Sequence, residues 1–322
     1  MLKLHFLGTS SGVPTRQRNV SGLAIQRGAS RPWYLVDAGE GTQHRFQQIG
    51  LSLHDLAAVF ITHAHGDHCY GLPGLLESAG MAERQGPLTL VAPQSVWQWL
   101  QATRQLTDAP LPYAVEHVDV ARHDTVLTHP GLAVTSHPLL HRVPSFAYRF
   151  AADETQTTMR VEALMATGLP RGPLWGRLQD GEDVVFNGHI LRSADFVERV
   201  NHQVAAVIGG DNADPMLLES ACVGAQLLVH EATYTQAVLD KVGPGPMHSS
   251  AQAVAQFAQQ AGLPNLVLTH FSARYHNPEG EAALLAEAQA RYHAQLWLAN
   301  DLDTFALDRT GQVSVQHAHA TS

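Results

Sequence analysis

The chain has 322 residues, which allows one large domain or two ordinary ones with a sizeable buried core. Its composition, 45% hydrophobic and 15% charged with a formal net charge of −9, excludes an intrinsically disordered chain and a uniformly basic nucleic-acid binder. Two cysteines cannot form a disulfide framework and no apolar run is long enough to cross a membrane, so we expect a cytoplasmic protein without a membrane segment.

Short apolar runs rich in β-branched residues alternate with helical patterns along the chain. Strands are expected at Leu2–Leu7, Leu23–Gln26, Trp33–Val36, Ala58–Thr62, Leu88–Val91, Ala133–Ser136, Ala147–Phe150, Val204–Ile208, Leu227–Val229, Leu266–Thr269, Gln295–Ala299 and Thr304–Leu307. Helices are expected at Thr42–Ile49, Leu72–Met81, Ser95–Gln105, Met216–Val223, Ser250–Ala261 and Gly280–His293. This α/β alternation favours two packed sheets with helices outside, or one large doubly wound sheet.

Residues 153–200 interrupt the alternation. A weak helix is expected at Thr155–Thr167, followed by a stretch rich in glycine and proline, Gly168–Arg177, with Trp175 between two arginines. Such a stretch makes a poor core and can form a protruding arm, but its composition alone favours an ordinary long surface insertion.

The strongest chemical signal lies directly after the strand expected at Ala58–Thr62. Twenty histidines are a marked excess for this chain, and three of them join a carboxylate here: His63, His65, Asp67 and His68. Gly66 lets the backbone turn between these side chains. Because imidazole and carboxylate ligands suit Zn²⁺, with Mn²⁺ or Fe as alternatives, the spacing predicts a metal site rather than a histidine-rich surface loop.

Single polar residues at three other strand ends are candidates for further ligands. Asp211 and His270 each follow an apolar run directly, and His141 follows a short run in which His137 competes for the same role. Each residue alone would be an ordinary polar strand terminus. Together with the first cluster, they predict two ions joined by a bridging carboxylate.

These motifs resemble the metallo-β-lactamase fold superfamily and, within it, the ribonuclease Z family of tRNA 3′-processing endoribonucleases, over essentially the whole chain. The matching segments are Phe6–Thr15 with Arg18-Asn19, Asp37–Gln43, His63–His68 with Gly71–Leu76, His230–Thr233, His248–Ser250 and His270–Tyr275. The metal motif alone indicates only the superfamily, whereas the accessory motifs indicate the family. The chain departs from the family pattern at Asn212, where threonine commonly follows the bridging aspartate, and at Ser250, Gln179 and Gly181.

The resemblance implies an αββα sandwich in which two mixed sheets are flanked by helices. It implies a single domain over residues 1–322, with residues 153–200 inserted as a flexible arm that grips tRNA, and so reverses the preference for an ordinary insertion. It also implies a homodimer, with no nucleotide cofactor. Two Zn²⁺ ions per subunit are expected, one held by His63, His65 and His141 and the other by Asp67, His68 and His270, with Asp211 between them.

The resemblance also supports catalytic roles for three residues. Asp67 would orient or deprotonate the attacking water. His248 is the candidate general acid for the ribose 3′-oxygen, and Glu231 would hold its tautomer. A purely structural role for His248 at a helix start is compatible with this one, because Ser249 and Ser250 can cap the next helix.

Candidate substrate contacts rest on weaker patterns. The loop Gly8–Thr15 follows a strand, and its backbone N–H groups can cradle phosphate, with Ser11 and Thr15 as side-chain contacts. Positive charge would come from the side chains of Arg18 and Arg274 near this loop and of Arg171 and Arg177 in the arm.

The sequence therefore predicts an endoribonuclease that cuts precursor tRNA after the discriminator nucleotide and leaves a 3′-hydroxyl. One alternative is a related two-metal phosphodiesterase that acts on cyclic nucleotides or small phosphodiesters. Another is an RNA-binding protein whose hydrolysis is incidental.

Overall fold

A computed structural model describes residues 1–317 of the chain. The chain divides into two units: the first comprises Met1–Ala152 and Val204–Ser322, and the second comprises Asp153–Gln203. Strands β9 (Ser145–Met159) and β12 (Val197–Ile208) each contribute residues to both units.

The first unit contains an eight-stranded mixed sheet. Its strands lie in the order β17 (Val313–Gln316), β16 (Thr304–Leu307), β1 (Leu2–Gly8), β2 (Gly22–Arg27), β3 (Trp33–Val36), β4 (Leu56–Phe60), β5 (Leu88–Ala92) and β6 (Val115–Asp119). Pairing is antiparallel from β17 to β3 and parallel from β3 to β6. The parallel half puts the carboxyl end of β4, where the histidine cluster begins, beside those of β3 and β5.

A seven-stranded mixed sheet forms the second half of this unit. Its order is β15 (Gln295–Leu298), β14 (Asn265–Thr269), β13 (Leu227–Glu231), β12, β9, β8 (Leu132–Leu139) and β7 (Thr125–His129). Strands β12 to β15 pair in parallel, and β7 to β9 are antiparallel. Three neighbouring parallel strands thus end together next to Asp211, Glu231 and His270.

The main core lies between the two sheets, because alternate side chains of each sheet turn inward to a shared apolar layer. Leu2, Leu4 and Phe6 of β1 are buried in it. The ring of Phe60 on β4 packs edge-to-face against Tyr148 and Phe150 of β9, with centroid distances of 5.1 and 5.2 Å. These aromatic contacts join the sheets close to the end of β4.

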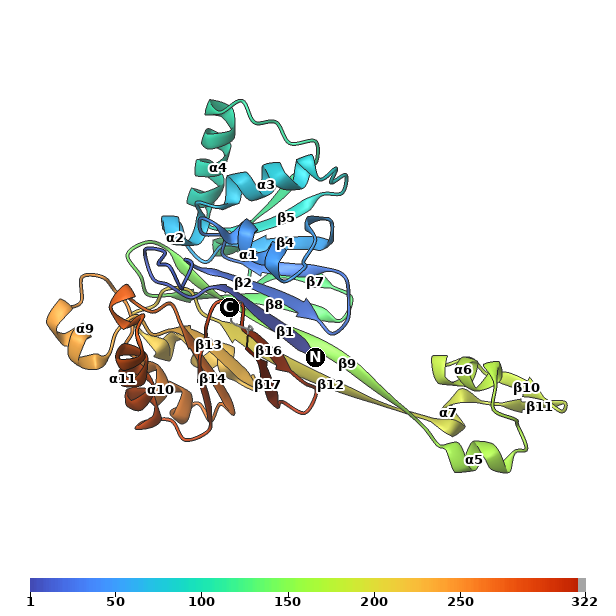
Figure 1. The fold of residues 1–322 in the computed structure, drawn as a ribbon. Coiled ribbons are helices and arrows are strands. Elements are labelled where there is room, and N and C mark those ends of the chain that lie inside the picture. The colour runs from blue at the N-terminus through green and yellow to red at the C-terminus, as the bar shows by residue number, and fades with distance from the viewer. Residues whose placement is uncertain (318–322) are drawn as a thin grey trace. The chain divides into compact units, whose positions relative to one another are not determined.

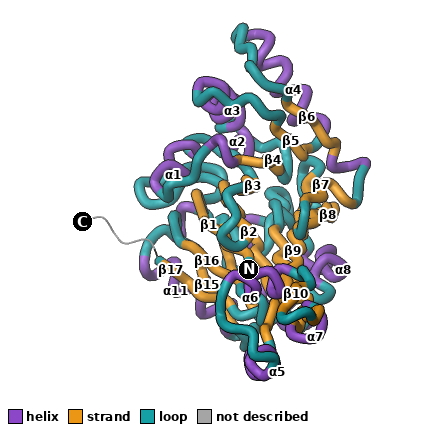
Figure 2. The backbone as a smooth tube through the Cα atoms, turned by 90° about the vertical axis from the view of Figure 1, so that its right-hand side faces the viewer, coloured by secondary structure: helices purple, strands orange, loops and turns teal. Residues whose placement is uncertain are grey.

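Helices cover the outer face of each sheet (Figures 1 and 2). On the eight-stranded sheet they are α1 (Thr42–Gln48), α3 (Leu72–Met81) and α4 (Gln94–Leu106); on the other they are α8 (Glu219–Cys222), α10 (Ala251–Gln260) and α11 (Pro278–Gln289). Short helices α2 (Gly66–Cys69) and α9 (Gln236–Val242) occupy loops. The predicted αββα sandwich is confirmed, and the doubly wound sheet is excluded.

The second unit has a small apolar core of its own. Its elements include helices α5 (Val161–Ala166), α6 (Pro173–Asp180) and α7 (Ser193–Phe196) and a hairpin of β10 (Val184–Phe186) and β11 (His189–Leu191). Leu164, Leu169, Leu178, Val184 and Val197 are buried together. The stretch rich in glycine and proline therefore contributes to a packed core.

The helix predicted at Thr155–Thr167 is wrong in its first half, because β9 continues to Met159 and α5 begins only at Val161. Thr155, Thr157 and Thr158 are β-branched and favour extended backbone over helix. Strands β6, β7, β10, β11 and β17 were not predicted. Most of them mix apolar with polar residues, and the apolar run of β10 is only three residues long.

No helix within residues 1–317 is long and apolar enough to cross a membrane. Both cysteines, Cys69 and Cys222, are buried as free thiols.

Candidate metal centre

Seven predicted metal ligands come together where strands of both sheets end. His63, His65, Asp67 and His68 lie on the loop after β4 and on α2, at the edge of the first sheet. His141 lies between β8 and β9, Asp211 follows β12, and His270 follows β14. Each half of the cluster therefore belongs to a different sheet.

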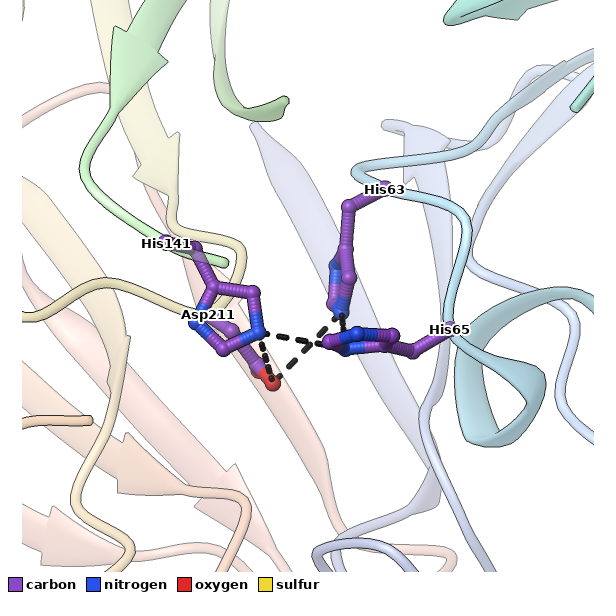
Figure 3. Close-up of side chains that lie close together, drawn as sticks. All are labelled: His63, His65, His141 and Asp211. Carbon is purple, nitrogen blue, oxygen red and sulfur yellow. Dashed lines mark hydrogen bonds and ion pairs between the residues drawn. The ribbon is translucent and has the colours of Figure 1, made fainter. Parts of the chain in front are cut away.

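Four of these residues form the first group of donors: His63, His65, His141 and Asp211 (Figure 3). Nδ1 of His65 lies 3.0 Å from Nε2 of His63 and 3.1 Å from Nε2 of His141. Oδ2 of Asp211 lies 3.5 Å from Nε2 of His63 and 3.7 Å from Nε2 of His141. Three imidazoles and one carboxylate oxygen thus point at a common centre.

The second group consists of Asp67, His68 and His270. Nε2 of His68 and Nε2 of His270 are 3.2 Å apart, and Oδ2 of Asp67 lies 3.5 and 3.4 Å from them. The other carboxylate oxygen of Asp211, Oδ1, lies 3.4 Å from His68 Nε2 and 3.3 Å from His270 Nε2. Asp211 therefore presents one oxygen to each group, as the bridging prediction requires.

The spacing of the donor atoms fits metal ligation. Zinc bonds of ~2.0–2.1 Å in a tetrahedral arrangement separate neighbouring ligand atoms by about 3.3 Å. The separations given above run from 3.0 to 3.7 Å, and all donor atoms of a group lie within 4.8 Å of one another. Neutral imidazoles and carboxylates are ligands for Zn²⁺ or a similar divalent ion. The residues present thus fit the group that the sequence predicts.

Hydrogen bonds to the far side of the imidazoles fix their orientation. Nδ1 of His68 lies 2.7 Å from Oδ2 of Asp37, which also accepts the hydroxyl of Thr62. Nδ1 of His141 donates to the carbonyl of Met247 at 2.8 Å. Nδ1 of His270 lies 3.1 Å from the Thr233 hydroxyl. Such partners select the tautomer that turns Nε2 toward the centre.

Sequence reasoning assigned no role to Asp37, Thr62 or Thr233. Asp37 comes directly after β3, so the strand-end rule that singled out the ligands applies to it as well.

Three residues without the freedom of glycine adopt left-handed backbone around the centre. The φ angles are 61° at Asp37, 58° at His270 and 57° at Met247. Because this conformation is unfavourable for residues with a Cβ, the surrounding structure must enforce it. Asp37 and Met247 each supply an acceptor that orients a ligand imidazole, and His270 is itself one of the ligands.

His248 lies beside the centre and contacts a buried carboxylate. Its Nδ1 is 3.1 Å from Oε1 of Glu231 and 3.7 Å from Oδ2 of Asp211. Burial lowers the pKa of His248, but the Glu231 and Asp211 carboxylates outweigh this effect and raise it to about 9. Burial raises the pKa of Glu231, yet its pairing with His248 brings it down to about 2. The two side chains therefore form a charged pair in the metal-free chain.

The histidines of the first group show the opposite behaviour. Burial is the main cause that lowers the pKa of His63, His65 and His141, and repulsion among neighbouring imidazoles adds to it. Neutral imidazoles are the form that binds a cation, so little proton release is needed at these ligands.

His137, which competes with His141 in the sequence, and Asn212, which follows Asp211, both lie outside the two donor groups. Nε2 of His137 is 3.1 Å from the Thr135 hydroxyl. Asn212 is completely buried, accepts hydrogen bonds from the N–H groups of Leu140 and Asp214, and donates to the Asp214 carbonyl. It therefore anchors the loop that carries Asp211.

The predicted substrate contacts near the centre lie on two segments, one with Ser11 and Thr15 and the other with Arg274. Ser11 and Thr15 lie on the loop whose Gly12 N–H donates to Oδ2 of Asp67 at 2.7 Å. The exposed Arg274 lies over the Tyr234 ring, 5.3 Å from its centroid, and that ring is 6.0 Å from the ring of His248. Arg274 is exposed, whereas Ser11 and Thr15 are half-buried, and the Thr15 hydroxyl accepts from the Arg18 N–H and lies 3.1 Å from Nδ1 of His276.

Arg18 does not fit its predicted role in substrate binding. It is only 3% exposed, and its guanidinium donates to Thr9, Ala299, Glu281 and Asn300. The charge of Arg18 is used to join the N-terminal loop to the C-terminal segment.

The two arginines predicted in the arm are exposed on the second unit. Arg171 lies over the Trp175 ring, 5.6 Å from its centroid. Nε of Arg177 pairs with Glu182 at 2.7 Å. An exposed ion pair of this kind holds a side chain only weakly, so both guanidinium groups remain available to an anion.

Comparison with known proteins gives the same fold and a more specific family. The model of the Beta-lactamase superfamily domain matches residues 32–166. Ribonuclease Z of Marinobacter nauticus is 47% identical over 317 residues, which cover 97% of this chain and 98% of that protein. Ribonuclease Z of Pseudomonas putida strain F1 is 45% identical over 319 residues, covering 96% and 98% of the two chains.

The solved structure of human tRNase Z, short form, superimposes with a TM-score of 0.65 and 23% identity, covering 95% of this chain and 99% of that one. The likeness of this structure supports the fold. The two bacterial relatives share almost half of their residues with this chain from end to end, and the chain therefore belongs to the ribonuclease Z family.

Proposed function

We propose that this chain is a metal-dependent endoribonuclease that removes the 3′ trailer of precursor tRNA. It hydrolyses the phosphodiester after the discriminator nucleotide and leaves a 3′-hydroxyl. The observation that carries the proposal is the position of Asp211, whose two oxygens each face one group of donors. It is found in a chain that is 47% identical to a Ribonuclease Z. The printed name of the human structure, tRNase Z, supports tRNA as the substrate class.

Two Zn²⁺ ions per subunit, or Mn²⁺ in their place, are the metals we propose. One ion would be held by His63, His65 and His141. The other would be held by Asp67, His68 and His270, and Asp211 would contribute one oxygen to each. Divalent cations at such a site supply positive charge to a phosphate oxygen and make water acidic near neutral pH.

Asp67 has the geometry of a group that orients the attacking water. The N–H of Gly12 donates to its Oδ2, so the carboxylate cannot rotate freely. The predicted phosphate cradle is not supported, because the N–H groups of Thr9, Ser10, Ser11, Val13 and Thr15 donate to backbone carbonyls of the protein. We propose instead that the loop holds Asp67 in place for the reaction.

His248 protonates the leaving oxygen. Its Nδ1 contacts Glu231, which leaves Nε2 to give a proton to the ribose 3′-oxygen. Glu231 acts as a positioning residue because it holds the imidazole without touching the substrate. Ser250 caps α10 by accepting from the Ala253 N–H, so the helix start also fixes the segment that carries His248.

The rest of the RNA is bound away from the reaction. We propose that the chain is one catalytic domain with an inserted arm, and that the arm, the second unit, binds tRNA through Arg171 and Arg177. Residues 151–200 contain 5 Arg against 8 Asp and Glu, a net charge of 5 − 8 = −3, so this binding rests on a few local contacts and is salt-sensitive. Ser11, Thr15 and Arg274 would contact the acceptor end. A homodimer in the cytoplasm, with no nucleotide cofactor, completes the proposal.

The test is cleavage of a 3′-extended precursor tRNA by the purified full-length protein, beside bis(p-nitrophenyl) phosphate. We expect a single cut after the discriminator that is lost when a chelator is added and restored by Zn²⁺ or Mn²⁺. Asp211→Asn should abolish both activities, whereas Asp124→Asn, an exposed carboxylate change, should leave both intact.

Two results would contradict the proposal. Turnover of the small diester without tRNA cleavage would favour a phosphodiesterase for small substrates. Cleavage that persists in chelator would remove the metal requirement.

A further inference from the structure

An aromatic pair, Tyr70 and Trp99, has no role in the chemistry above, and its Tyr70 ring lies beside Gly66 in the segment that carries His65 and Asp67. Tyr70 follows α2 directly and is 62% exposed, and Trp99 lies on α4. Their ring centroids are 5.7 Å apart with an interplanar angle of 33°. Among the large hydrophobic side chains that are exposed within residues 1–317, Tyr70 is the only aromatic one.

The Tyr70 ring is anchored to the loop that carries the ligands. A Cβ atom on Gly66 would lie 2.6 Å from Cδ2 and 2.7 Å from Cζ of this ring, which is closer than atoms can pack. Gly66 stands between His65 and Asp67, so the ring rests on the backbone that joins one ligand from each donor group. Tyr70 is therefore held at the edge of the centre, with much of its surface open to solvent.

We propose that the Tyr70–Trp99 pair is a stacking platform for an unpaired base of the trailer strand, on the 3′ side of the scissile phosphodiester. This inference rests on the proposed function. A base offers a flat apolar face whatever its sequence, and an aromatic ring binds it with little sequence preference. Such tolerance suits trailers that differ between precursors.

The side of the scissile bond follows from the position of His248. This residue serves the ribose 3′-oxygen, so the nucleotide upstream of the cut lies near it. Its ring neighbours are His141, Tyr234 and His270. Tyr70 instead contacts Gly66, between His65 and Asp67. Among the described residues, the ring contacts of His248 do not include Tyr70, and we therefore place the downstream nucleotide at Tyr70.

A fluorescent base gives a direct test of stacking. The probe is a 3′-extended tRNA with 2-aminopurine as the first trailer nucleotide and a 3′-methylene-phosphonate at the scissile position, which blocks cleavage by the metal-loaded full-length protein. Binding to the wild type should quench the fluorescence. Tyr70→Phe should preserve the quenching, and Tyr70→Ala and Tyr70→Leu should lose most of it. Leu106→Ala, at the exposed end of α4, is the matched control and should behave as wild type.

Cleavage kinetics with an abasic first trailer nucleotide complete the test. Tyr70→Ala should lower kcat/KM about 5- to 150-fold on the normal precursor and cause no further loss on the abasic one. An equal loss on both precursors, quenching that is unchanged in Tyr70→Ala, or conversion of a dimer into monomers by that variant would overturn the inference. If the wild type fails to cleave any precursor tRNA, the proposed function itself is wrong. If it cleaves precursor tRNA and the cleavage does not depend on Tyr70, only the stacking platform is wrong.

Discussion

Glu231 is buried and accepts five hydrogen bonds. Its Oε1 accepts from the N–H groups of Ser249 and Asn212 and from His248, and its Oε2 accepts from the N–H and the hydroxyl of Thr233. A carboxylate with this many donors is ionised and immobile. The imidazole that it holds is consequently limited to one orientation, which is what a general acid needs.

Replacement of His248 by alanine should affect substrates according to their leaving groups. On precursor tRNA, whose alkoxide leaving group needs a proton, we expect kcat to fall about 10²- to 10⁴-fold. On bis(p-nitrophenyl) phosphate, whose phenolate leaves unprotonated, the loss should be less than about tenfold. Steady-state kinetics on both substrates, with metal content measured in each preparation, checks this.

Equal losses on the two substrates would assign His248 to binding or metal retention and remove it as the acid. Glu231→Gln is the companion variant, since it keeps the shape of the side chain and removes the charge that faces His248. Like His248→Ala, this variant should lose more kcat on precursor tRNA than on bis(p-nitrophenyl) phosphate, but the difference should be smaller.

Asn212 supports the bridging residue from within the core. Its amide holds Leu140 and Asp214, so Asn212→Ala leaves buried backbone groups without partners. We expect a loss of about 1–3 kcal/mol in the free energy of unfolding, measured by urea denaturation of the metal-free protein. Asn201→Ala, an exposed change, should shift stability by less than about 0.5 kcal/mol. Similar stability of both variants would show that water replaces the amide.

Among the helices, α11 has the clearest end signal. Asn277 precedes it, its side chain accepts from the Gly280 N–H at 2.8 Å, and Pro278 occupies the first turn. Asn277→Ala should cost about 0.5–2 kcal/mol of unfolding free energy, and Asn277→Asp should retain the native stability. Chemical denaturation of the three proteins provides the comparison, and equal midpoints would mean that solvent satisfies these amides.

Strands were predictable where both faces are buried. The runs at β3, β4, β13 and β14 are largely apolar, and the expected bounds differ from the observed ones by at most two residues. Strand β6 could not be predicted in this way. Its residues are at most partly buried, and the polar residues Glu116, His117 and Asp119 are typical of a loop. The outer part of β9 has the same exposed, polar character, and its extended backbone depends on pairing with distant residues.

The metal ligands were predictable because they follow strands in the sequence, and their division into two groups was expected from the resemblance to the family. Which oxygen of Asp211 faces which histidines depends on how the two sheets pack, and short-range sequence patterns do not determine that packing. Arg18 shows the reverse failure. In the sequence, a basic residue next to a loop rich in Gly, Ser and Thr suggests a contact with a bound anion. Only the fold shows that the guanidinium of Arg18 already donates to Glu281 and Asn300.

The two units have separate cores, so loss of the second should spare the chemistry of the first. Replacing residues 153–203 with an Asn-Gly turn would join Ala152 to Val204, on strands that are neighbours in the sheet. The shortened protein should bind metal and hydrolyse bis(p-nitrophenyl) phosphate, while kcat/KM for precursor tRNA falls at least about 100-fold, mainly through KM.

Unchanged tRNA cleavage by the shortened protein would remove the second unit from substrate binding. Loss of metal binding would instead show that the first unit depends on it for folding. Metal analysis and circular dichroism distinguish these results before any kinetic comparison.

The distribution of the ligands between the sheets also orders events during synthesis. His63, His65, Asp67 and His68 leave the ribosome early, whereas His270 is made when most of the chain is complete. A nascent chain thus carries an incomplete set of donors, and hydrolytic competence has to wait until the second sheet has docked on the first.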